Sequence, residues 1–225
     1  MGKLSVVATP IGNLEDITLR ALRTLKECDV IYAEDTRVTS KLLAKYGLRK
    51  SVFRLDAATE LKKTDEIIAR LEAGGHVALV SDAGTPGISD PGARLVSLIR
   101  TNGGIAKIEA IPGPSALTAA LSVAGLDSPE FAFLGFLPHK KGRQTALKKL
   151  AVRDTPTVLY ESPHRILKLL KELEGLKIPR VTIARELTKI HEEVISGSPA
   201  ELITRFAKYP DTLRGEFVVI IESSR

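Results

Sequence analysis

The sequence has few of the residues on which common redox, zinc and membrane sites depend. Cys28 is the only cysteine among 225 residues, so an internal disulfide and a cysteine-rich zinc site are both excluded. Tryptophan is absent, and aromatic residues make up 4% of the chain. No apolar run reaches the roughly 18 residues that cross a bilayer, and the first residues lack the apolar segment of a signal peptide. These absences predict a cytoplasmic protein with no membrane association.

Several familiar catalytic motifs are also missing. The sequence contains no G-x-x-x-x-G-K-[ST] phosphate loop, no G-x-G-x-x-G after its first predicted strand, no H-E-x-x-H and no G-x-S-x-G. The four histidines are scattered along the chain, at His76, His139, His164 and His191. ATPase, hydrolase and zinc-enzyme functions therefore lose most of their support, and we predict no metal site.

Positive charge is concentrated in two stretches that contain no acidic residue. The whole chain has 33 Lys and Arg against 27 Asp and Glu. The stretch from Asp35 to Asp56 encloses Arg37, Lys41, Lys45, Arg49, Lys50 and Arg54, and the stretch from Glu130 to Asp154 encloses Lys140, Lys141, Arg143, Lys148, Lys149 and Arg153. The two stretches could form one phosphate-binding surface, or they could be two solvated helix faces.

The hydrophobic pattern predicts an α/β protein with two α/β domains. In the first half, strand-like runs at 4–9, 30–33, 52–55, 76–80 and 108–111 alternate with helical patterns, which indicates a mostly parallel sheet covered on both faces. The Pro- and Gly-rich run at 111–115 favours a boundary there, giving domains 1–112 and 113–225. Several strands of the second half follow one another without a long helix, so its sheet is predicted to be mixed.

Four loops follow strands at the edge where open α/β sheets bind ligands, at 8–14, 33–37, 81–92 and 112–116. Each could be an ordinary turn or helix cap. The loop at 81–92 is harder to explain in that way, because three glycines, two prolines and two aspartates follow a predicted buried strand. Glycine-rich loops of this kind leave backbone N–H and C=O groups accessible to a ligand.

Six motifs together resemble a known family. They are VATPIGNL (7–14), AEDTR (33–37), SDAGTPG (81–87), PGPS (112–115), ESPHR (161–165) and RELTK (185–189). In this order they resemble the small-subunit ribosomal RNA methyltransferases I, which belong to the tetrapyrrole methylase superfamily of class III S-adenosylmethionine (SAM)-dependent methyltransferases. The resemblance runs from Ser5 to about Glu222. Many members of that family continue past the last predicted strand, whereas this sequence ends at Arg225.

The resemblance implies a fold, a cofactor and a substrate. Family members have two α/β domains with SAM bound between them, usually form homodimers, and methylate the ribose 2′-hydroxyl of a cytidine in the decoding region of small-subunit rRNA. The small ribosomal subunit is therefore the implied partner. Carried over by position, the SAM contacts are Pro10, Ile11, Asp82, Thr85, Ser115, Ala116, Tyr160, Ala184 and Glu216.

Methyl transfer to a ribose hydroxyl needs more than correct alignment with the sulfonium methyl, because the hydroxyl is almost fully protonated at neutral pH. A base, or a cation that stabilises the developing alkoxide, would help. By residue type and motif membership the catalytic candidates are Asp35, Glu161, Lys189 and Glu192, although each could instead form an ion pair that organises a loop. His164 could be a base or a helix cap. The candidate RNA-binding residues are Arg37, Lys41, Lys45, Lys140, Lys141, Arg143 and Arg165.

Two alternatives remain at this point. A tetrapyrrole-like small molecule could be the methyl acceptor, although such a substrate does not need twelve dispersed cations. The chain could also be a non-catalytic ribosome-binding protein, although its loops keep the Gly, Pro and Asp residues of a cofactor site.

Overall fold

The computed structural model describes residues 1–56, 59–101 and 105–222, and it divides the chain into two compact units, Met1–Ser115 (unit 1) and Ala116–Arg225 (unit 2). The α/β class is confirmed, as are the parallel sheet in the first half and the mixed sheet in the second. The boundary between the units follows Ser115, three residues beyond the boundary after Pro112 that the sequence predicted. Within the described residues, no helix is long and apolar enough to cross a membrane.

Unit 1 is built on one parallel sheet with the strand order β3-β2-β4-β1-β5. Its strands are β1 (Gly2–Val7), β2 (Val30–Ala33), β3 (Val52–Arg54), β4 (His76–Val80) and β5 (Ala106–Ile111), and its helices are η1 (Leu14–Asp16), α1 (Leu19–Glu27), α2 (Thr36–Lys45), α3 (Glu60–Glu72) and α4 (Ala93–Thr101). Because all five strands run in one direction, the loops that follow them emerge at a single edge.

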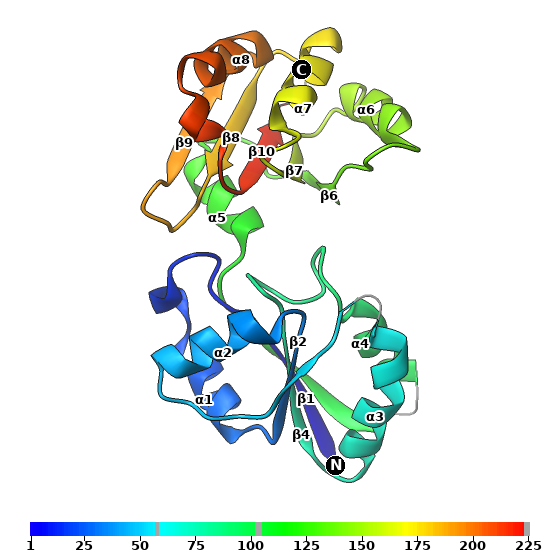
Figure 1. Cartoon of the computed structure of the whole chain (residues 1–225). Helices are drawn as coiled ribbons and strands as arrows, with labels where there is room; N and C mark the ends of the chain where they lie inside the picture. Colours follow the sequence, from blue (N-terminus) through cyan, green and yellow to red (C-terminus); the bar gives the residue numbers. More distant parts are fainter. Residues whose placement is uncertain (57–58, 102–104, 223–225) are drawn as a thin grey trace. The chain divides into compact units, whose positions relative to one another are not determined.

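Helices cover both faces of the unit 1 sheet, because its buried strands are apolar on both sides. Leu25 of α1 and Leu42 of α2 pack on one face with Val7 and Val80, while α3 and α4 pack on the other face. Figure 1 shows α1 and α2 on one side of this sheet and α3 and α4 on the opposite side. The loops after the neighbouring strands β1 and β4 therefore lead to opposite faces, the arrangement at which open α/β sheets bind ligands.

Unit 2 has a mixed sheet with the order β6-β7-β10-β8-β9, in which β6 and β7 are parallel and the other neighbouring pairs are antiparallel. Its strands are β6 (Ala132–Phe136), β7 (Thr157–Glu161), β8 (Val181–Arg185), β9 (Glu193–Gly197) and β10 (Phe217–Ile221), and its helices are α5 (Ala116–Val123), α6 (Arg143–Ala151), α7 (Ile166–Gly175), α8 (Pro199–Lys208) and η2 (Pro210–Leu213). Leucines and Phe206 from α6, α7 and α8 form its main core against Leu159, Ile183 and Val219. Helix α5 contacts β10.

Candidate active site

The loops that follow β1, β4 and β5 are hydrogen-bonded to one another at the carboxyl edge of the unit 1 sheet. Thr9 and Gly84 exchange two backbone hydrogen bonds, with N···O distances of 2.9 and 3.0 Å. The Thr9 hydroxyl donates to the Ser81 carbonyl at 3.1 Å, and the Thr85 hydroxyl donates to the Pro114 carbonyl at 3.3 Å. Three motifs that are far apart in the sequence therefore meet in space.

Two glycines allow this close approach. Gly84 has φ +83°, and a Cβ there would lie 3.4 Å from Ile11 Cγ2. A Cβ on Gly113 would lie 3.0 Å from the Cβ of Ala8, closer than most real Cβ contacts. A side chain at Gly113 would push its loop away from Ala8, and at Gly84 the positive φ would strain any other residue.

Asp82 connects the loop after β2 to the same group. Its Oδ1 accepts a hydrogen bond from the backbone N–H of Asp35 at 2.8 Å. We call the segments 8–14, 33–37, 81–92 and 112–115 the loop cluster. It contains the cofactor contacts expected in unit 1, namely Pro10, Ile11, Asp82, Thr85 and Ser115, of which the first two are buried and the other three half-buried.

In unit 2 two of the expected cofactor contacts, Tyr160 and Ala184, share one face of the sheet. Val218 pairs in register with Tyr160 on one side and with Ala184 on the other, while the adjacent Leu159 and Ile183 point into the main core. Ala184 is only 1% exposed. Glu216 directly precedes β10 with its side chain exposed, and Ala116 opens α5. Contact of these residues with a cofactor stays a prediction.

Asp35 is unsuited to be a general base. Its carboxylate caps α2 by accepting from the backbone N–H of Arg37, and it also pairs with the Arg37 guanidinium. Hydrogen bonds from Arg37 lower the pKa of Asp35 to about 2. A carboxyl that is so easily ionised has little affinity for a proton at neutral pH.

Glu161 belongs to a buried ion-pair cluster in unit 2. Its side chain is inaccessible to solvent, and its carboxylate lies 2.6 Å from the Arg165 guanidinium and 3.7 Å from that of Arg143. Arg143 also forms a close pair with Glu172, at 2.7 Å. The four side chains form a structural cluster, because each buried charge has an opposite charge beside it. The geometry argues against Glu161 as a catalytic base.

The prediction that Arg143 binds RNA is wrong, because its side chain is only 3% exposed and already pairs with Glu172 and Glu161. Arg165 is 14% exposed and pairs with Glu161, so it too has little surface for a phosphate. Both guanidinium groups instead fix the chain that follows β6. Arg143 donates to the Pro138 carbonyl at 3.3 Å and Arg165 to the Leu137 carbonyl at 3.1 Å.

Lys189 and Glu192 stabilise the loop between β8 and β9 through ion pairs and a hydrogen bond. The Lys189 ammonium lies 2.9 Å from both Glu186 and Glu216. Burial opposes the charge, but the two carboxylates outweigh it and hold the pKa of Lys189 above its ordinary value. Glu192 accepts from the backbone N–H of Thr188, which has φ +66°. Lys189 is therefore a permanent cation, and Glu192 stabilises a strained turn.

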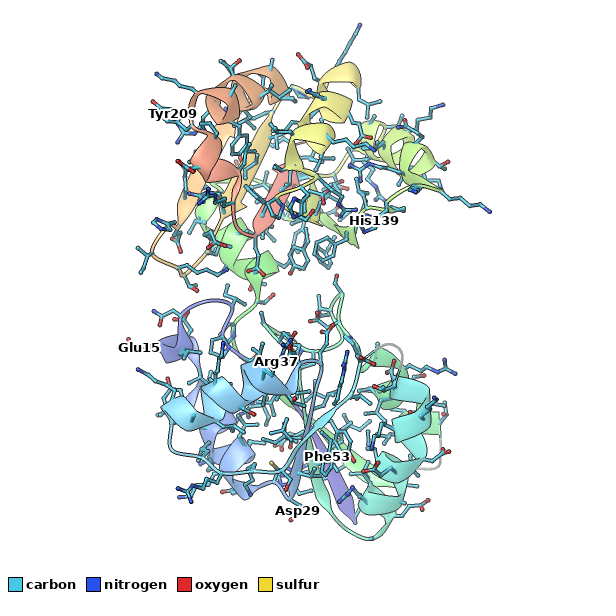
Figure 2. All side chains as sticks on the ribbon, viewed as in Figure 1. Glu15, Asp29, Arg37, Phe53, His139 and Tyr209 are labelled. Carbon is cyan, nitrogen blue, oxygen red and sulfur yellow. The ribbon has the colours of Figure 1, made fainter. Side chains whose placement is uncertain are left out.

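The remaining RNA-binding candidates are exposed. Arg37, Lys41 and Lys45 recur every four residues on α2, so they form one stripe on its surface. Lys140 and Lys141 lie on the loop between β6 and α6 beside His139. Figure 2 labels Arg37 on α2 and His139 on this loop. His164, exposed in the turn before α7, is not assigned a role by the structure.

Sequence reasoning gave no role to Glu34 and Asp90, which lie in the loop cluster with Asp82. Burial, reinforced by the charges of Glu34 and Asp82, raises the pKa of Asp90 to about 6. Burial and the Asp82 charge also raise the pKa of Glu34. Glu34 and Asp90 follow the neighbouring strands β2 and β4, so the strand pattern could have indicated that these carboxylates lie near each other. The sequence could not reveal how deeply they are buried, and the burial is the main cause of their raised pKa values.

We predict that Glu161→Gln destabilises the protein by about 3 kcal/mol, because it leaves the Arg165 guanidinium without the carboxylate charge that offsets its burial. At this chain length that corresponds to a Tm lower by roughly 6–12 °C in thermal denaturation. The exposed Lys140→Ala is the control and should change stability by less than about 0.5 kcal/mol. A Tm for Glu161→Gln equal to that of the control would show that the cluster is not structural.

We predict that Asp90→Asn stabilises the protein only above the pKa of Asp90. The folded-state pKa of about 6 exceeds the ordinary aspartate value of 3.8, so the folded state holds the proton more tightly than the unfolded chain. The stability of the wild type therefore falls as pH rises through this interval, and the variant lacks that loss. After allowance for solvent screening, its advantage should be on the order of 1 kcal/mol at pH 7.5 and absent near pH 3.5. Equal differences in Tm at both pH values would contradict this prediction.

Comparison with known proteins agrees with the family resemblance that the six motifs indicate. The family model of the Tetrapyrrole (Corrin/Porphyrin) Methylases matches residues 3–203. A relative from Thermotoga maritima, named ribosomal RNA small subunit methyltransferase I, is 46% identical over 98% of this chain and 98% of its own length. A relative of the same name from Escherichia coli O157:H7 is 42% identical over 100% of this chain and 79% of its own length.

Solved structures show the same fold at lower identity. The methyltransferase CobJ superposes with a TM-score of 0.72 at 19% identity, covering 100% of this chain and 95% of its own. Diphthine synthase superposes with a TM-score of 0.74 at 18% identity, covering 98% of this chain and 90% of its own. The family model and the relatives at above 40% identity together establish that the chain belongs to the tetrapyrrole methylase family, in the group whose members are named ribosomal RNA small subunit methyltransferase I.

Proposed function

We propose that this chain transfers a methyl group from SAM to the ribose 2′-hydroxyl of a cytidine in the decoding region of small-subunit rRNA. The observation that carries the proposal is the 46% identity, over nearly the whole of both chains, to a relative named ribosomal RNA small subunit methyltransferase I. A tetrapyrrole-like acceptor has weaker support. The likeness to uroporphyrin-III-C-methyltransferase is 21% in sequence and concerns the fold.

The loop cluster suits SAM by the chemistry of its groups. Asp82 offers a half-buried carboxylate to the ribose hydroxyls or to the ammonium of the cofactor. The glycines at 87 and 113, which are not buried, leave backbone groups accessible to the adenine edge and the amino-acid end. We place the cofactor contacts at Pro10, Ile11, Asp82, Thr85 and Ser115, with Ala116, Tyr160, Ala184 and Glu216 as the proposed contacts in unit 2.

SAM supplies a methyl group on a sulfonium, which is a strong electrophile. Transfer of this methyl group to the 2′-oxygen would leave the bonding pair on sulfur and would require a base of the chain to take the hydroxyl proton. Within the loop cluster, Asp90 has a pKa of about 6, close to neutrality, so we propose it as the proton acceptor. Lys189 remains protonated and is the proposed cation for the developing negative oxygen.

Exposed cations are the proposed contacts with the small ribosomal subunit. Arg37, Lys41 and Lys45 in unit 1 and Lys140 and Lys141 in unit 2 would bind phosphates, and such binding weakens as salt rises.

We further propose that the protein works in the cytoplasm as a homodimer. Light scattering should then give a mass of about twice 24.3 kDa, and a monomer mass at micromolar concentration would contradict the dimer.

We predict that Asp82→Ala weakens SAM binding at least about tenfold, because the charged hydrogen bonds it makes are each worth about 1.5–3 kcal/mol. Calorimetry with SAM measures the affinity, which we expect to be roughly micromolar in the wild type. Transfer of labelled methyl groups to purified small subunits should fall in parallel. Asp211→Asn, at an exposed acid outside the loop cluster, is the control and should match the wild type.

Two outcomes distinguish a failure of the proposed function from a wrong assignment of Asp82. If the wild type neither binds SAM nor labels small subunits, the proposed function fails. If it does both and Asp82→Ala behaves like Asp211→Asn, the assignment of Asp82 is wrong and the function stands.

A further inference from the structure

The edge strand β6 presents aromatic side chains on one face because it contains a bulge. In a regular strand, Phe133 and Phe136 would point to opposite faces, since they are three residues apart. The register with β7 shifts between Phe133 and Gly135, and Gly135 has φ +60°. The extra residue turns both phenylalanines toward the same neighbour, Tyr160.

The three rings form a compact group, which we call the aromatic cluster. The ring centroid of Tyr160 lies 5.0 Å from that of Phe133 and 5.6 Å from that of Phe136, and both contacts are edge-to-face. Phe136 is nevertheless 55% exposed. An aromatic ring that is held by its neighbours but left open to solvent is a rigid surface on which another flat ring can stack.

Positive charge follows the aromatic cluster closely in the sequence. Four to five residues after Phe136, the chain exposes Lys140 and Lys141, and no acidic residue occurs between positions 130 and 154. The nearby acids of the ion-pair cluster, Glu161 and Glu172, are compensated by Arg143 and Arg165. The same two arginines donate to the carbonyls of Pro138 and Leu137, so they fix the short segment that joins Phe136 to the lysines.

We propose that the aromatic cluster stacks an unpaired nucleobase of the RNA substrate, and that Lys140 and Lys141 bind phosphates of the same strand. Single-stranded RNA is recognised in this way, by aromatic side chains that stack on bases beside a basic track for the backbone. Because Tyr160 is also a proposed SAM contact, the stacking surface for the base is the exposed ring of Phe136, which Tyr160 supports. SAM has no phosphate for the two lysines, and this favours RNA as the ligand at Phe136. The inference rests on the proposed function and adds residues that position its substrate.

The test uses the full chain and a fluorescein-labelled 12-nucleotide single-stranded RNA, read by fluorescence anisotropy. A second RNA carries abasic sites at its central nucleotides, so it keeps the phosphates but loses the bases. Phe136→Ala should weaken binding of the first RNA at least about fivefold and leave binding of the abasic RNA unchanged. Phe136→Trp should restore binding, because it replaces the stacking surface.

Two further variants serve as comparisons. Phe131→Ala removes a phenyl that is 43% exposed and lies before β6, and it should bind both RNAs as the wild type does. The double variant Lys140→Ala, Lys141→Ala should weaken both RNAs alike and lower the salt slope by about 1.4, since two phosphate contacts are lost.

Three outcomes would overturn the proposal: equal effects of Phe136→Ala and Phe131→Ala, an equal loss on both RNAs, or a loss of SAM affinity in calorimetry while RNA binding is kept. The last outcome would assign the cluster to the cofactor's adenine. Failure of the proposed function would look different, because base-dependent RNA binding by the wild type without methylation of small subunits contradicts that function alone.

Discussion

The pair of backbone hydrogen bonds between Thr9 and Gly84 joins the loops on which the candidate site depends. The parallel order of β4, β1 and β5 brings these loops to one edge, and the glycines at 84 and 113 let them touch. Side chains add further links between the same loops, because Asp82 accepts from the backbone N–H of Asp35 and the Thr85 hydroxyl donates to the Pro114 carbonyl. Burial in the loop cluster, reinforced by the charges of Glu34 and Asp82, raises the pKa of Asp90.

Unit 2 divides its arginines and lysines into two roles. Arg143 and Arg165 are buried against Glu161 and Glu172, where they hold the chain that follows β6. The lysines on that chain are exposed, and their charges have no acidic neighbours in sequence. Guanidinium groups suit the first role because they bind several oxygens in fixed directions, and ammonium groups suit loose contact with phosphates. A basic stretch is therefore not uniformly a binding surface.

The sequence predicted the fold class and the loops at the carboxyl edge of the first sheet, since both depend on local patterns. Alternating apolar runs indicated the parallel sheet, and the Gly- and Pro-rich segments indicated the loops that follow its strands. Other properties depend on contacts between distant residues. The partners of Arg143 include Glu172, 29 positions away, so its burial could not be predicted from the basic stretch around it. The bulge at Gly135 and the pKa of Asp90 likewise arise from pairing and burial that composition does not encode.

The most direct test of the account identifies the methylated atom. Small ribosomal subunits lacking this modification are incubated with the chain and SAM carrying a labelled methyl group, and the rRNA is then digested to nucleosides and separated by chromatography with mass detection. The account predicts that the label is in 2′-O-methylcytidine, with the methyl group on the ribose. Label on a base carbon or nitrogen, or no label in rRNA from a chain that binds SAM, would contradict it.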